Sequence, residues 1–197
     1  MTATRQFTID DLANLPDDGN RYEIIEGELY VTAAPGDEHQ GVIAALLVAL
    51  ETWRRAGGGG RLRAGIGLIF SRRDGVIPDL VWAAPDQLPA MLIDPATGRR
   101  DGKWHRAPAL VVEVLSPGAE NAERDRETKL TLYDRRGVRE YWIVDPVSRA
   151  VEVYRRREGA LQLAATVLQG ETLTSPQLPG LALPVAGLFE EAEPSDQ

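Results

Sequence analysis

The chain has no cysteine among its 197 residues, and it has only two histidines and two methionines. The missing cysteines exclude disulfide bonds and thiolate metal centres. No apolar run approaches the ~20 residues that a bilayer-spanning helix needs, and the first residues lack the basic and apolar regions of a signal peptide. We therefore expect a cytoplasmic protein that does not contact a membrane.

Positive charge is also scarce, since 22 Lys and Arg stand against 30 Asp and Glu, for a net charge of −8. A surface that holds nucleic acid by bulk electrostatics needs an excess of Lys and Arg, so any nucleic-acid contact must be local. The remaining composition, 43% apolar and 26% charged, is ordinary for a globular protein. We expect one domain over residues 1–190 and a disordered tail over 191–197.

The succession of apolar patterns predicts an α/β fold with a mixed sheet. A strand, a helix and a strand in sequence predict two parallel neighbours joined by a right-handed connection. An N-terminal hairpin is expected at 21–32, and a β extension is expected beyond residue 160. The other elements expected are a core-facing helix at 37–56, strands at 61–70, 76–84, 109–115, 139–145 and 150–156, and a helix at 121–136.

An acid lies inside the apolar run 109–115, which is typical of a strand buried on both faces. This acid, Glu113, must have a cation, a neighbouring side chain or a raised pKa, because an unpaired buried charge costs several kcal/mol. If strands 61–70, 76–83 and 109–115 form an antiparallel run, Asp79 lies beside Glu113. Two converging carboxylates suit Mg²⁺ or Mn²⁺. A strand-capping aspartate and a glutamate paired with an arginine explain the same residues equally well.

The helix at 121–136 adds basic and hydroxyl groups near these acids. Arg126, Lys129 and Tyr133 are spaced i, i+3 and i+7, so on an α-helix they share one stripe, and Leu130 beside them turns that stripe toward the sheet. A lysine near a metal and two acids can orient an attacking water and stabilise charge on a phosphoryl oxygen. The commoner fate of such a lysine is to extend into water.

Four short motifs occur in order along the chain: Pro-Asp at 78–79, EVLSP at 113–117, KLTLY at 129–133 and GVREYWIVDP at 137–146. Together they resemble the Uma-two family, a bacterial branch of the PD-(D/E)xK nuclease superfamily. The resemblance covers nearly the whole chain and implies a restriction-endonuclease-like mixed central sheet flanked by helices. It also implies phosphodiester hydrolysis with metal ions, and Asp79 and Glu113 as the metal ligands.

One position departs from the superfamily pattern. The superfamily lysine normally stands two residues after the strand glutamate, and this chain has Leu115 there. Related exonuclease-like branches carry Gln and Tyr at the spacing of Lys129 and Tyr133, which implies a lysine that has migrated to the helix. A nuclease fold without activity stays open.

The resemblance also marks His39, at the start of the first long helix, as an auxiliary residue. It raises interest in Glu26 and Glu28. The hairpin pattern by itself assigns both of these acids, together with Glu23, to a solvated turn.

The leading hypothesis is a Mg²⁺-dependent (or Mn²⁺-dependent) endonuclease acting on DNA. Asp79 and Glu113 would hold the metal, Lys129 would position the attacking water, and Arg126 and Tyr133 would orient phosphate or the lysine. One alternative is an inactive nuclease-fold module that binds nucleic acid or a protein partner. Another is a carboxylate-pair hydrolase acting on a small molecule or sugar, which leaves Lys129 without a role.

Two segments further predict a symmetric homodimer. The long connection at 85–107 reads as a flap or interface arm. The C-terminal segment carries several leucines, which together with the arm offer more apolar surface than one small domain needs. These leucines are Leu178, Leu181, Leu183 and Leu188.

Overall fold

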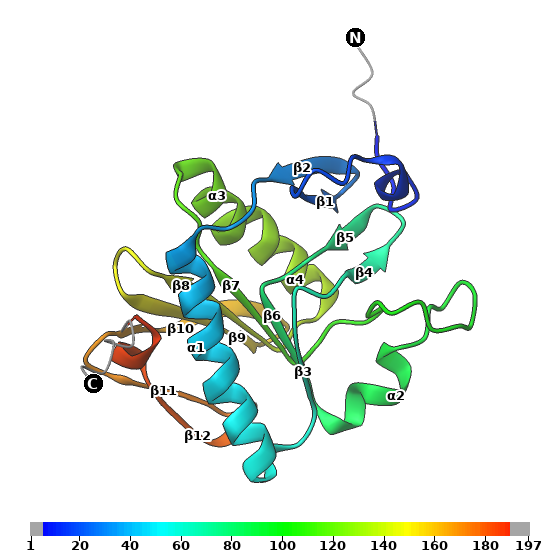
Figure 1. Ribbon diagram of the computed structural model, residues 1–197. Helices are drawn as coiled ribbons and strands as arrows, with labels where there is room; N and C mark the ends of the chain where they lie inside the picture. Colours follow the sequence, from blue (N-terminus) through cyan, green and yellow to red (C-terminus); the bar gives the residue numbers. More distant parts are fainter. Residues whose placement is uncertain (1–5, 190–197) are drawn as a thin grey trace, which may run out of the picture.

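The computed structural model describes residues 6–189 (Figure 1). Its strands and α-helices are β1 Arg21–Ile25, β2 Glu28–Thr32, α1 Asp37–Trp53, β3 Arg61–Ala64, β4 Leu68–Ser71, β5 Asp74–Val76, β6 Leu80–Ala83, α2 Leu88–Met91, β7 Leu110–Val114, α3 Ala119–Glu123, α4 Leu130–Arg136, β8 Glu140–Asp145, β9 Ala150–Arg157, β10 Ala160–Leu168, β11 Thr172–Ser175 and β12 Leu178–Pro184. The predicted mixed α/β fold, its N-terminal hairpin and its C-terminal β extension are confirmed.

A six-stranded sheet in the order β10-β9-β8-β7-β6-β3 forms the centre. Strands β7 and β8 are parallel, as the strand, helix, strand pattern predicts, and the other neighbours in this sheet are antiparallel. A second sheet, β2-β1-β5-β4, lies beside the helix that contains α3 and α4 (Figure 1). No helix within residues 6–189 is long and apolar enough to cross a membrane.

Side chains alternate between the two faces of the central sheet, and this alternation separates two hydrophobic cores. Along β7, Leu110, Val112 and Val114 pack with α1 and the β11–β12 hairpin. Val111 points to the other face, where it packs with α4. Because side chains alternate along a strand, Glu113 lies on the α4 face with Val111.

The helix before β8 is continuous but not α-helical throughout. Residues Arg124–Lys129 between α3 and α4 form a π-helical turn, and Gly137 closes the helix in the left-handed conformation with φ of 85°. Short π-helical segments inside α-helices are frequent at functional sites. This turn carries the lysine predicted to be functional.

The strands expected at 61–70 and 76–84 are each divided between the two sheets. The chain leaves the six-stranded sheet after Ala64 and enters the four-stranded sheet at Leu68, then returns through Ile77 and Pro78. Gly65, with φ of 57°, permits the first change of direction, and its N–H donates to the carbonyl oxygen of Asp79. Asp79 therefore lies where the chain crosses between sheets, which the strand patterns do not reveal.

Of the two segments expected to form a dimer interface, the C-terminal one packs against its own chain, and the 85–107 connection is anchored there by Trp104 while residues 95–103 stay exposed. Trp104 of the 85–107 connection is buried and exchanges backbone hydrogen bonds with Gly67 and Ile69. The four C-terminal leucines, Leu178, Leu181, Leu183 and Leu188, are buried in the core beneath α1. The disordered tail expected at 191–197 lies outside the described residues, and the single-domain boundary stays a prediction.

Asp74 of β5 joins the hairpin to the helix and is only 3% exposed. It accepts hydrogen bonds from Glu26 N and Ser71 Oγ, both at 2.8 Å, and forms an ion pair with Arg136. Burial opposes ionisation of Asp74, but these three partners outweigh it and hold the pKa below the ordinary value of 3.8. The ionised carboxylate therefore stabilises the fold.

We expect Asp74→Asn to lower the free energy of unfolding by about 1–3 kcal/mol at neutral pH. Because the folded pKa lies below the unfolded one, this stabilisation is present above the unfolded pKa and disappears as the pH falls through the folded value. Urea unfolding across pH should show the difference between variant and parent narrowing below about pH 4. Asp17→Asn, in an exposed loop, is the control, and a pH-independent difference for Asp74→Asn would contradict the account.

Candidate functional site

Asp79 and Glu113 meet at one end of the central sheet, as predicted. The antiparallel register pairs Leu80 of β6 with Val112 of β7, so the two acids are neighbours. Asp79 Oδ2 accepts a hydrogen bond from Val114 N at 2.8 Å, and Asp79 N makes a long contact of 3.4 Å to Glu113 Oε2. Both side chains are almost completely buried.

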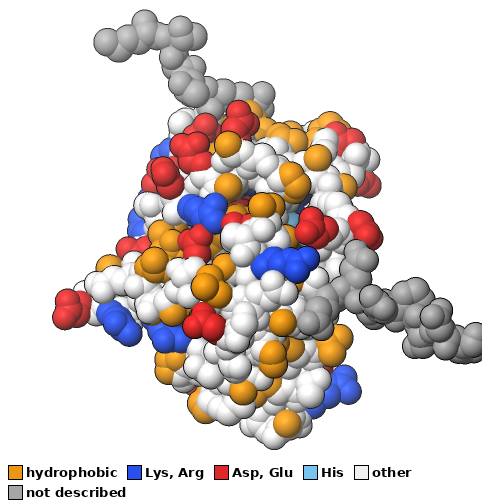
Figure 2. Space-filling view, turned by 90° about the vertical axis from the view of Figure 1, so that its left-hand side faces the viewer, with side chains coloured by type: hydrophobic (Ala, Val, Ile, Leu, Met, Phe, Trp, Pro, Cys, Tyr) orange, Lys and Arg blue, Asp and Glu red, His pale blue; other side chains and the backbone are white. Residues whose placement is uncertain are grey.

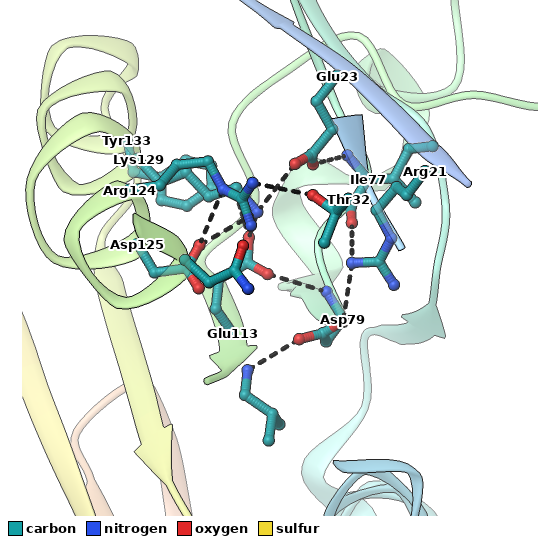
Figure 3. Close-up of polar contacts among 12 residues, drawn as sticks. Arg21, Glu23, Thr32, Ile77, Asp79, Glu113, Arg124, Asp125, Lys129 and Tyr133 are labelled. Atoms are coloured by element: carbon teal, nitrogen blue, oxygen red, sulfur yellow. Dashed lines mark hydrogen bonds and ion pairs between the residues drawn. The ribbon is translucent and has the colours of Figure 1, made fainter. Parts of the chain in front are cut away.

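Lys129 points into the protein and reaches Glu113 directly (Figure 3). Its Nζ lies 3.0 Å from Glu113 Oε1, 3.2 Å from Glu23 Oε2 and 3.4 Å from Asp125 Oδ1, and the residue is 2% exposed. The predicted inward lysine is therefore present and does not extend into water. Burial lowers the pKa of Lys129, but the three carboxylates outweigh burial and raise the pKa above its ordinary value. Lys129 is consequently a permanent cation and a hydrogen-bond donor.

Tyr133, one helical turn further on, also belongs to this group. Its hydroxyl donates to Glu113 Oε1 at 2.6 Å. Burial, together with the charge of Glu113, raises the tyrosine pKa well above its ordinary value, so the hydroxyl keeps its proton. Burial likewise raises the pKa of Glu113 to about 8, and the nearby acids add to this effect while Lys129 opposes it.

Two buried acids at this site were not predicted, namely Glu23 and Asp125. Glu23 Oε1 accepts from Ile77 N at 2.7 Å, whereas Glu23 Oε2 and Asp125 Oδ1 have no hydrogen-bond partner among the described residues apart from the ion pairs that both make with Lys129. The i, i+4 spacing of Asp125 and Lys129 is a signal that could have identified Asp125. Glu23 had no such signal. The hairpin pattern indicated a solvated position for this acid, and only the tertiary structure buries it.

His39 and Arg21 hold Asp79 from the opposite side. His39 Nε2 lies 3.2 Å from Asp79 Oδ2, and Arg21 Nη1 lies 2.9 Å from Asp79 Oδ1. Burial opposes ionisation of Asp79, but the hydrogen bond with His39 and the charge of Arg21 outweigh it and lower the pKa to about 2. The structure thus places His39 at the site, as the family resemblance implied, and adds Arg21.

Arg126, Glu26 and Glu28 are not brought to the site. Arg126 forms ion pairs with Asp145 and Glu152 instead. The predicted stripe assumed α-helical winding, whereas the i to i+5 bonds of the π-helical turn wind the chain less per residue. Residues four apart then share a face better than residues three apart, so a different residue of this turn, Asp125, joins Lys129. Glu26 and Glu28 flank the exposed hairpin turn, as their pattern suggested.

A small cavity of about 20 Å³ lies among these side chains, lined also by Ser116 and Arg124. This volume suits one water molecule or a small ion. Arg124 Nη1 donates to Thr32 Oγ1 at 2.9 Å and thereby ties the helix to β2. The side of the molecule in Figure 2 mixes acidic, basic and hydrophobic side chains and shows no continuous basic area, which agrees with the net negative charge.

The oxygen atoms around this cavity fit a hard divalent cation. Within residues 6–189 no three His, Asp or Glu side chains are already arranged so that they could hold a metal ion together. Mg²⁺ does not require such an arrangement, because it commonly binds one or two carboxylates, keeps several waters and takes further ligands from phosphate groups. The hydrogen bond described for Glu113 Oε2 is long, and Glu113 and Asp79 line the same cavity. These two carboxylates are therefore the candidate ligands.

Comparisons with known proteins agree with this fold. A solved structure described as a putative nuclease belonging to DUF820, from Anabaena variabilis ATCC 29413, matches with a TM-score of 0.73 and 19% sequence identity, covering 93% of this chain and 97% of that one. At this identity the match shows a common fold. No curated protein matches the chain. A family model, Uma2, described as "Putative restriction endonuclease", matches residues 9–186, and the chain belongs to this family.

Proposed function

We propose that this protein is an endonuclease that uses a divalent cation, Mg²⁺ or Mn²⁺, to hydrolyse phosphodiester bonds in DNA. One observation carries the proposal: a buried lysine contacts Glu113 at 3.0 Å, beside the point where Glu113 and Asp79 converge. A sugar hydrolase would use two carboxylates without such a lysine. The Uma2 family and the nuclease fold of the matching structure support the same assignment.

Each side chain has a separate role in this proposal. Asp79 and Glu113 would hold the cation. When bound, the cation stabilises negative charge on a phosphoryl oxygen and lowers the pKa of water. Lys129 stays charged, so it donates a hydrogen bond to the attacking water or to a phosphoryl oxygen and does not act as a base. Tyr133 fixes the orientation of the Glu113 carboxylate, and His39 orients that of Asp79.

A module that keeps the nuclease fold without cleaving is the second candidate. It is favoured by the internal pairing of the acids, because both Asp79 oxygens and Glu113 Oε1 already contact protein donors. Buried charge clusters of this kind also occur as purely structural features. The two candidates differ in one measurable property, which is turnover.

The test measures cleavage of supercoiled plasmid, linear double-stranded DNA and single-stranded DNA. Each substrate is incubated with Mg²⁺ or Mn²⁺, and EDTA is the control. We expect metal-dependent cleavage that Arg126→Ala retains, because Arg126 pairs with Asp145 and Glu152 away from the site. Absence of cleavage of every DNA form with either metal would favour the binding module.

We also propose a symmetric homodimer, formed through a surface other than the one expected from the sequence. Strand β10 lies at the edge of the central sheet, has no charged residue along its nine residues, and exposes Leu163 and Leu168 by 54% and 55%. An uncharged edge strand can pair with its own copy about a two-fold axis.

Light scattering should give twice the chain mass of 21.6 kDa. Leu163→Lys should give the monomer, and a monomeric parent at micromolar concentration would contradict the proposal.

A further inference from the structure

A second polar hollow lies at the far end of the helix that carries Lys129. It has a volume of about 520 Å³. Three of its lining residues are arginines, drawn from the β4–β5 turn and from the last turn of α4. The full lining is Glu26, Ser71, Arg73, Asp74, Arg135 and Arg136.

The arginines of this hollow outnumber the acids. Arg136 pairs with Asp74, and Arg135 pairs with the exposed carboxylate of Glu26. Arg73 donates to the carbonyl oxygen of Glu26 at 2.6 Å, which uses no carboxylate. Three guanidinium groups therefore face two carboxylates, and the hollow carries net positive charge in a chain whose total is −8.

Donor capacity also remains in the hollow. The side-chain hydrogen bonds described for Arg73 and Arg136 all leave from Nη2. A guanidinium group has five N–H donors in a planar fork, which matches the oxygens of a phosphoryl group. Glu26 is 64% exposed at its side chain, so an incoming anion can displace it at small cost.

We propose that this arginine hollow binds a phosphoryl group and that Glu26 occupies its place in the absence of that ligand. A phosphate of the DNA strand is the favoured source, and this part rests on the proposed nuclease function. Free phosphate has the same chemistry and is distinguished by the test below.

The position of the hollow relative to the candidate site favours a DNA phosphate. The β1–β2 hairpin runs along the helix, from the contact of Thr32 with Arg124 beside the site to the contact of Glu26 with Arg135 at the hollow. A further hollow of about 300 Å³ lies along this seam, lined by Tyr30, Thr128 and Thr131 among others. Lys129 and Arg135 are separated by about 10 Å along the helix, or roughly three base-pair rises of DNA. One strand can therefore reach both places.

The experiment measures binding without cleavage. Anisotropy of labelled duplex DNA in EDTA, over a range of salt concentrations, is compared between the parent and Arg73→Ala/Arg135→Ala. Thermal shift with inorganic phosphate at constant ionic strength forms the second arm. Arg99→Ala/Arg100→Ala removes the same charge from the exposed 85–107 connection and is the matched control.

We expect the hollow variant to bind DNA more weakly by at least about tenfold, since it loses the charge-assisted hydrogen bonds of two guanidinium groups. The slope of log K against log salt should fall by about 1, while the control stays close to the parent. The stabilisation by inorganic phosphate should disappear in the hollow variant, and Glu26→Gln should increase it because the competing carboxylate is removed.

The possible outcomes distinguish failure of the phosphate-site proposal from failure of the proposed nuclease function. If phosphate binding is lost but DNA binding is unchanged, the hollow stands as a site for free phosphate. If the parent binds phosphate through these arginines but binds no DNA, the proposal of a DNA substrate is wrong and the proposal of a phosphate site in the hollow stands. If the hollow variant retains both phosphate and DNA binding, the inference is overturned, even when the parent cleaves DNA.

Discussion

Replacing Lys129 by methionine is expected to abolish DNA cleavage and to lower the free energy of unfolding by about 3–5 kcal/mol. The ammonium group is the shared counterion of Glu23, Glu113 and Asp125, all of which are buried. Without it, the three acids must either stay charged in a poorly solvated place or take up protons. Urea unfolding and a cleavage assay measure the two effects.

Because Lys129→Met is expected to destabilise the protein, a second variant with higher stability is needed to separate loss of catalysis from loss of the fold; we call it the compensated variant. Lys129→Met/Glu23→Gln removes one buried acid together with the lysine, so it should recover part of the stability. It should still fail to cleave, because neither substitution restores a cation at the reacting phosphate. Arg126→Met is the matched control on the same helix, and its partly exposed ion pairs predict a change of no more than about 1 kcal/mol. A compensated variant that is folded and cuts as fast as the parent would contradict the role of Lys129.

Asp79→Asn and Glu113→Gln are each expected to abolish binding of Mn²⁺ in calorimetry and to reduce cleavage by about 10³-fold or more. The size follows from losing several kcal/mol of metal-derived stabilisation of the transition state. Asp86→Asn, which removes an exposed acid paired with Arg139, is the control. If Mn²⁺ binding is unchanged in both site variants, these acids are not the ligands.

The two site variants should differ in stability without metal. Burial raises the pKa of Glu113, so an uncharged amide at this position removes the desolvation cost of the carboxylate and offsets the lost ion pair with Lys129, and Glu113→Gln should cost little. Asp79 is held ionised by Arg21 and His39, with a pKa of about 2, so Asp79→Asn places an amide N–H against donors whose hydrogen bonds one carboxylate oxygen now accepts. Equal destabilisation by both substitutions would contradict these assignments.

Local pattern was sufficient for most elements of the fold. The apolar alternation of β1 and β2, the helical spacing along α1 and the parallel pair β7 and β8 all follow from sequence periodicity. The division of the expected strands between two sheets does not, because a strand keeps the same period whichever sheet it joins. The packing of Trp104 and of the C-terminal leucines on their own chain likewise depends on contacts between distant segments.

The site divides in the same way. The sequence by itself determined that Glu113 needs a partner, and with an assumed antiparallel strand order it predicted Asp79 beside Glu113. Helical spacing predicted that Lys129 and Tyr133 face the sheet, where both contact Glu113. Only the tertiary structure decided which other charges complete the cluster. The π-helical turn selects Asp125 over Arg126, and the hairpin docked on the helix buries Glu23. The physical reason is that burial of a charge depends on what covers it, and here the covering segments lie about a hundred residues apart in the chain.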